Sequence, residues 1–266
     1  MGFFQSVLFG IVSFLASVVG AICGIGGGVI IKPTLDLFGW ASVSTISFLS
    51  GCTVLSMSCY NVVKGMMAGD SKVDTKIGTP LATGAAIGGV AGKLMFSAIK
   101  AMFANPNTVG AVQACCLAVI TLGTLLYTVN KSKIKTHTVT SAVSSVLIGL
   151  VLGISSSFLG IGGGPINLVV LYYFYSMDTK TAAANSLYII LYSQAASFLM
   201  TLITRTVPEF AVIALVLMVA GGIGGGMVGR ARYKKLDNKA VERLFVGLMA
   251  VIILISVYNT WKYAMV

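Results

Sequence analysis

The stretch GIGGGVIIKP at residues 24–33 has a close copy, GIGGGPINLV, at residues 160–169. Each copy places four glycines in five positions, directly after an apolar segment of about 20 residues, which is long enough for one membrane-spanning helix. Glycine weakens a helix by roughly 1 kcal/mol relative to alanine and adopts positive φ angles at little cost. We therefore expect the helix to break at each run and a new short helix to begin after it, at Val29 and at Pro165.

The composition is that of a membrane protein, because 57% of the 266 residues are hydrophobic and only 9% are charged, whereas about a quarter are charged in soluble domains. Eight apolar segments of spanning length are found at about 3–23, 43–63, 77–99, 109–129, 139–159, 181–204, 208–229 and 241–262. The apolar pieces 29–38 and 165–175 are too short to span as helices, so we interpret them as re-entrant or half-membrane helices. The predicted fold is all-α and polytopic, with about eight transmembrane helices.

An internal repeat divides the chain into two transmembrane halves, 1–130 and 131–266. The glycine run at Gly24 recurs at Gly160, and Ile87-Gly88-Gly89 recurs at Ile223, both at an offset of 136 positions. Four crossings in each half would make the halves parallel, whereas a fifth crossing by the glycine-run piece would invert them, and both arrangements remain open. Spacing of four on one helix predicts two smooth ridges for close helix packing, formed by Gly84, Gly88 and Gly92 and by Gly221, Gly225 and Gly229.

Several classes of protein are disfavoured by the sequence. The net charge of +11 comes from short basic clusters between apolar runs, without the aromatic and basic groove pattern of nucleic-acid-binding proteins. We assign these basic residues, Lys93 among them, to the two sides of the membrane. The side that carries the dense cluster from Arg230 to Arg243 is expected to be cytoplasmic. Five cysteines without a CxxC pair and one histidine support neither a metal site nor a cofactor, and the scattered acids argue against an enzyme.

The paired breaks predict a binding site near the middle of the membrane. Unpaired backbone groups are costly in hydrocarbon unless protein or a wet cavity satisfies them, and equivalent breaks in two halves are typical of transporter binding sites. Helix starts carry partial positive charge and free N–H groups, so the expected ligand is a small anion. Tight packing without function is the alternative for the glycines that we predict to bind, namely Gly26, Gly27, Gly28, Gly162, Gly163 and Gly164.

Polar side chains near the breaks complete the predicted site. Lys32 follows the first run, and Asp36 lies one turn later on the same face, if this piece is helical. The lysine either attracts the anion or extends to the membrane interface. Uncharged groups that could bind an oxyanion, or that could instead bond neighbouring helices, are Ser50, Asn61, Asn167, Asn185, Ser186 and Gln194.

The sequence resembles the sulfite exporter TauE/SafE family in GIGGGVIIKP, in the second copy GIGGGP, in AAANS at residues 182–186 and in its two-fold repeat. The resemblance covers nearly the whole chain. It implies a multi-pass permease of the bacterial inner membrane, or plasma membrane, that moves sulfite or related organosulfur anions, usually outward. Two departures affect the choice of anion: Lys32 stands where the family pattern is usually apolar, and Val169 replaces an expected proline.

The leading hypothesis is therefore a transporter that binds a small anion between the two glycine breaks and has the lipid bilayer as its surroundings. An anion channel, or a receptor or subunit without transport activity, is the alternative. A homo-oligomer is left open by the sequence.

Overall fold

The computed structural model describes residues 2–102 and 106–265, and within these ranges the chain is helical with short connections. The helices are α1 (Phe3–Cys23), α2 (Gly28–Phe38), α3 (Val43–Met67), α4 (Thr75–Met102), α5 (Pro106–Asn130), the 3₁₀ turn η1 (Lys131–Lys133), α6 (Ala142–Leu159), α7 (Gly164–Tyr175), α8 (Thr179–Ile203), α9 (Val212–Lys235) and α10 (Asn238–Met265). Eight of these described helices are long and apolar enough to cross a membrane. The all-α, polytopic prediction is confirmed.

Helix boundaries differ most from the sequence prediction where polar residues continue a helix. The seventh apolar segment was expected to end at residue 229, but α9 continues through Arg230 to Lys235. Hydropathy marks the part of a helix that suits lipid, whereas the backbone ladder continues until a cap or a break ends it. The basic cluster from Arg230 to Arg243 therefore begins within helix α9 and not in a loop.

The helix ladder is interrupted at both glycine runs by left-handed backbone. Gly24, Gly26 and Gly27 have φ angles of 75°, 80° and 71°. The second run repeats the pattern, with 66°, 80° and 75° at Gly160, Gly162 and Gly163. Only glycine adopts such angles without steric cost, so the sequence of each run dictates its local conformation.

Each break turns the chain back on itself. The Phe9 ring of α1 stacks on Trp40, which follows α2, with ring centroids 6.3 Å apart, so α2 returns toward the start of α1. In the second half, the Tyr175 hydroxyl at the end of α7 donates to Ser145 Oγ near the start of α6, at 2.7 Å. The α1–α2 and α6–α7 units are therefore re-entrant hairpins.

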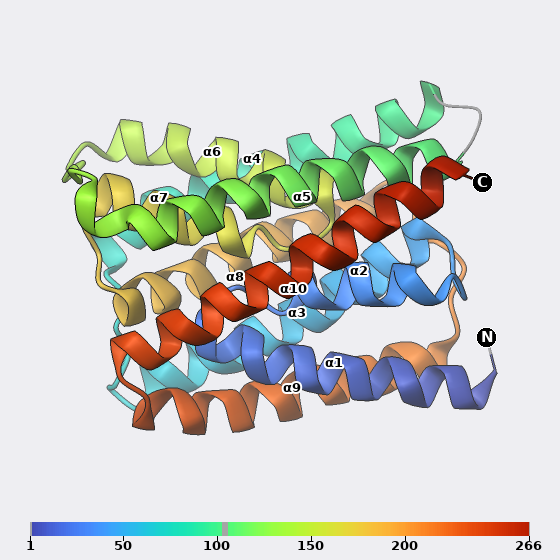
Figure 1. Ribbon diagram of the computed structural model, residues 1–266, viewed down its shortest axis with the longest axis horizontal. Helices are drawn as coiled ribbons and strands as arrows, with labels where there is room; N and C mark the ends of the chain where they lie inside the picture. The colour runs from blue at the N-terminus through green and yellow to red at the C-terminus, as the bar shows by residue number, and fades with distance from the viewer. Residues whose placement is uncertain (1, 103–105, 266) are drawn as a thin grey trace.

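The two hairpins enter from opposite ends of the bundle. The end of α2 lies beside the end of α10, where Lys262 Nζ donates to the Leu37 carbonyl at 2.8 Å. Both chain termini lie at this end (Figure 1), which we call the terminal end. The residues after α7 instead contact the start of α10, where the Lys180 amide donates to Asn238 Oδ1 at 3.1 Å. We call this opposite end the far end.

The glycine ridges are sites of close helix packing, as predicted. A Cβ atom at Gly84, Gly88 or Gly92 of α4 would overlap backbone atoms of α6, and one at Gly221, Gly225 or Gly229 of α9 would overlap backbone atoms of α1. Helix α6 of the second hairpin thus packs on α4, and α1 of the first hairpin packs on α9. Close backbone contact of this kind is a strong source of helix association in lipid.

Candidate functional site

The two glycine runs lie against each other in the interior. A Cβ at Gly28 would stand 2.5 Å from the carbonyl oxygen of Ile161, and one at Gly164 would overlap Ile25. All of the predicted glycines, Gly26, Gly27, Gly28, Gly162, Gly163 and Gly164, are buried. The runs therefore face each other and are in direct contact.

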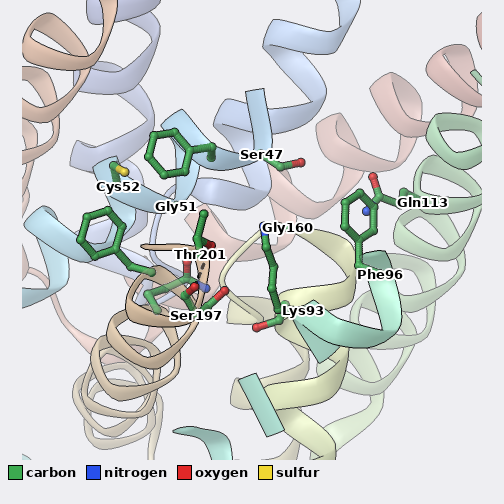
Figure 2. Close-up of a pocket in the computed structure, with 13 residues that line it drawn as sticks. Ser47, Gly51, Cys52, Lys93, Phe96, Gln113, Gly160, Ser197 and Thr201 are labelled. Atoms are coloured by element: carbon green, nitrogen blue, oxygen red, sulfur yellow. Dashed lines mark hydrogen bonds between the residues drawn. The ribbon is translucent and has the colours of Figure 1, made fainter. Parts of the chain in front are cut away.

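A pocket lies on the terminal-end side of this junction and encloses about 500 Å³ of empty space, including its open mouth. Figure 2 shows its walls, which come from five helices. Its lining residues are Ser47, Phe48, Gly51 and Cys52 of α3, Lys93 and Phe96 of α4, Gln113 of α5, Ser157 and Gly160 from the end of α6, and Gln194, Ser197, Phe198 and Thr201 of α8. We call it the terminal-end pocket.

Hydrogen-bond donors and one cation converge on this pocket. Figure 2 shows Lys93 extending from α4 into the middle of the group, and the amides of Gln113 and Gln194 line the walls. Among the described residues, Ser47 Oγ and Ser157 Oγ are buried without a hydrogen-bond partner. Buried polar groups are nearly always paired, so these two hydroxyls are available to donate to a molecule that enters the pocket.

A buried ion pair lies behind the pocket wall. Lys32 is only 4% exposed, and its Nζ is 3.6 Å from Asp36 Oδ2 on the same helix. The same Nζ donates to Gln113 Oε1 at 2.9 Å. The expected placement of Lys32 and Asp36 on one face of a helix is found, and the Lys32 side chain ends inside the protein, between the Asp36 carboxylate and the Gln113 amide.

A second pocket lies at the far end and is lined by Ala21, Asn61, Val62, Gly65, Asp70, Ser71, Lys72, Val73, Ala183, Ala184, Leu187, Arg230 and Tyr233. We call it the far-end pocket. Its rim is held by Asp70, which pairs with Arg230 Nη2 and with Lys234 Nζ at 2.5 Å. Hydrogen bonds from Lys234 and Arg230 lower the pKa of the Asp70 carboxyl.

The uncharged residues predicted to bind are divided among several environments. Gln194 lines the terminal-end pocket and Asn61 the far-end pocket. Ser50 and Ser186 are fully buried, and their hydroxyls, like Asn167 Oδ1, have no partner among the described residues. Asn185 accepts from the Asp74 amide at 3.1 Å and donates to the Lys72 carbonyl at 3.2 Å, so it holds the loop before α4.

Sequence reasoning missed the most polar side chains of the terminal-end pocket. Lys93 was assigned to a membrane side, but α4 continues past it to Met102. Gln113 and Ser157 were not singled out, although each lies within an apolar segment of spanning length. A charge or an amide inside such a segment is costly and thus a signal of function. Within the described ranges, no cluster of His, Cys, Asp and Glu could hold a metal ion.

Comparison with protein families decides the class of protein. The family model for the sulfite exporter TauE/SafE matches residues 9–255, which include both glycine runs and both pockets. The chain belongs to this family. It is a family of membrane transporters for sulfur anions and not of enzymes. No curated protein and no solved structure matches the chain.

Proposed function

We propose that this TauE/SafE member exports a small sulfur oxyanion, such as sulfite, across the cell inner or plasma membrane and binds it in the terminal-end pocket. The observation that carries the proposal is the convergence of Lys93 with the unpartnered hydroxyls of Ser47 and Ser157 in one pocket. A lysine supplies charge, and hydroxyls and amides donate to an oxyanion's several acceptor oxygens. The Phe48, Phe96 and Phe198 rings lower the local dielectric and strengthen these interactions.

The glycine runs contribute to this proposed site through the backbone. Helix α2 starts at Gly28 and α7 at Gly164, and helix starts leave N–H groups without partners in the helix. We propose that these starts, with Gly26, Gly27, Gly162 and Gly163, give the junction a positive potential that favours passage of the anion. Among the described residues, the Ser50 and Ser186 hydroxyls have no hydrogen-bond partner and offer further donors in the interior; Asn167 lies just after the second run.

Transport would use the two pockets in turn. Ser47 and Gly51 of the terminal-end pocket correspond to Ala183 and Leu187 of the far-end pocket at the repeat offset of 136. Opposite entry of the two hairpins supports halves 1–130 and 131–266 that are inverted repeats. Inverted repeats typically alternate between two conformations that expose a central site to either side.

Flux into reconstituted liposomes tests the proposal. Purified protein should take up radiolabelled sulfite or thiosulfate with saturable kinetics, and replacement of Lys93 by glutamine should reduce the uptake. Uptake equal to that of empty vesicles would overturn the transport proposal. Normal uptake by Lys93→Gln and Ser157→Ala variants would overturn the assignment of the site, and unitary currents in a planar bilayer would show a channel instead.

A further inference from the structure

The buried pair of Lys32 and Asp36 lies outside the lining of the terminal-end pocket, and a buried ion pair is rarely a source of stability. Asp36 is 5% exposed, and its Oδ1 has no hydrogen-bond partner among the described residues. From α10, Tyr263 faces the carboxylate, and Lys262 Nζ lies 3.5 Å from the Asp36 carbonyl oxygen. Helices α1 and α3 present apolar side chains to α2, including Phe9 and Ile46.

This pair is connected to the terminal-end pocket through one amide. Gln113 lines the pocket, accepts from Lys32 Nζ at 2.9 Å and donates from Nε2 to the Phe158 carbonyl at 2.5 Å. A Cβ at Gly160, another lining residue, would lie 3.5 Å from Lys32 Cε. An anion in the pocket would therefore sit one side chain away from the lysine and close to the carboxylate behind it.

A bound anion would change the balance of charge around Lys32 and Asp36. With the pocket empty, Lys32 and Asp36 neutralise each other. A bound anion near Lys32 adds negative charge to a region of low dielectric, where like charges repel strongly. The repulsion is removed when a proton from water at the terminal end adds to the Asp36 carboxylate. Lys32 then remains as the counter-charge of the anion.

We propose that anion binding in the terminal-end pocket is linked to protonation of Asp36, so that one proton is carried with each anion. This rests on the proposed function, and it names the coupling ion of that site. No bond of the anion changes, because the proton moves from water to a carboxylate oxygen and back to water after release. A doubly charged anion with one proton retains one net negative charge, so an inside-negative potential still favours its export.

The linkage is measured most directly by thiosulfate binding as a function of pH, because thiosulfate stays doubly charged across the range. Linkage is reciprocal, so affinity should rise by up to about tenfold for each unit of decreasing pH while Asp36 is ionised in the empty protein. An Asp36→Asn variant should bind thiosulfate with the high affinity of the acidic condition at every pH. Glu209→Gln removes an exposed carboxylate at the same end and should behave as the parent protein.

Proton movement gives an independent measurement. Liposomes loaded with a pH-sensitive dye and given an inward thiosulfate gradient should acidify with the parent protein and with Glu209→Gln. Thiosulfate uptake without acidification is expected for Asp36→Asn. Saturable uptake that is independent of pH and moves no proton in the parent protein would overturn the coupling and leave the proposed function intact. No uptake at any pH would overturn the proposed function itself.

Discussion

The two pockets of this transporter are built from corresponding helices but differ in chemistry. Ser47 and Ser157 of the terminal-end pocket correspond, at the repeat offset, to Ala183 and Ala21 of the far-end pocket. In the described part of the chain, Ser47 and Ser157 of the terminal-end pocket have hydroxyls without partners, whereas Asp70 at the far-end rim is paired with Arg230 and Lys234. The terminal-end pocket therefore has hydroxyls that can donate to a ligand, whereas the rim of the far-end pocket is held by ion pairs.

This difference indicates that side chains, more than helix placement, distinguish the two pockets. Helices α3 and α8 line both pockets, so the backbone supplies a similar framework twice, and the side chains make the two linings chemically different. The substitutions described below test the helix framework separately from the side chains of each pocket.

The largest effect is expected for Gly164→Val, because a Cβ there would overlap Ile25 of the opposite run. Backbone atoms cannot move aside as a flexible side chain would, so we expect a loss of more than about 4 kcal/mol of stability. The measurement is the yield of monodisperse protein and its unfolding temperature in detergent. Gly247→Val is the matched control because nothing lies within 4 Å of its Cβ position; equal stability of the two variants would contradict the close junction.

The next effect is expected for Lys93→Gln, which removes the cation from the terminal-end pocket while keeping a polar side chain. Hydrogen bonds to charged groups contribute about 2 kcal/mol, so thiosulfate affinity should fall by about 30-fold. Isothermal titration of purified protein measures this, with Lys135→Gln in the exposed connection before α6 as the control. Unchanged affinity would place the anion elsewhere.

The sequence was sufficient for the framework because the framework depends on local rules. Length of apolar segments predicts the spans, and glycine predicts the breaks at Gly24–Gly28 and Gly160–Gly164, where positive φ angles are found. The glycine ridges also follow from spacing alone, since residues four apart lie on one helix face.

The binding chemistry was less predictable because it depends on which helices meet. Nothing local to Lys93 indicates that α4 brings it beside Gln113 of α5 and Gln194 of α8. Asn185 shows the opposite error. It lies in the AAANS stretch and was predicted to bind the anion, but the loop before α4 folds onto it and its amide donates to the Lys72 carbonyl. Which residues line a pocket is decided by the tertiary structure. A polar residue in an apolar segment is only a candidate for the pocket lining.

A smaller effect is expected when the far-end rim is opened by Asp70→Asn, which removes both ion pairs. Because the folded-state pKa of Asp70 is lowered, the pairing is complete above the carboxyl's ordinary pKa and is lost only as pH falls through the lowered value. Near neutral pH the substitution is therefore needed to open the rim. An Ala184→Cys reporter on a cysteine-free background should react a few-fold faster with a membrane-impermeant maleimide.

High salt should mimic this change in the parent reporter protein, since exposed pairs are screened. Glu209→Gln at the other end of the bundle serves as the control. If Asp70→Asn leaves the labelling rate unchanged, the ion pairs do not close this pocket.

The smallest effect on stability, and the sharpest distinction between a binding wall and ordinary packing, is expected for Ser157→Ala. The Ser157 hydroxyl has no partner among the described residues, so its removal should change stability by less than about 0.5 kcal/mol. If the hydroxyl donates to the anion, affinity for thiosulfate should fall by about fivefold, the equivalent of about 1 kcal/mol. Ser256→Ala in α10 is the matched control, because that hydroxyl is also buried and unpartnered in the described structure but lies outside the pocket lining. A structural role for Ser157 would make the two variants alike in affinity, whereas a binding role lowers affinity in Ser157→Ala alone.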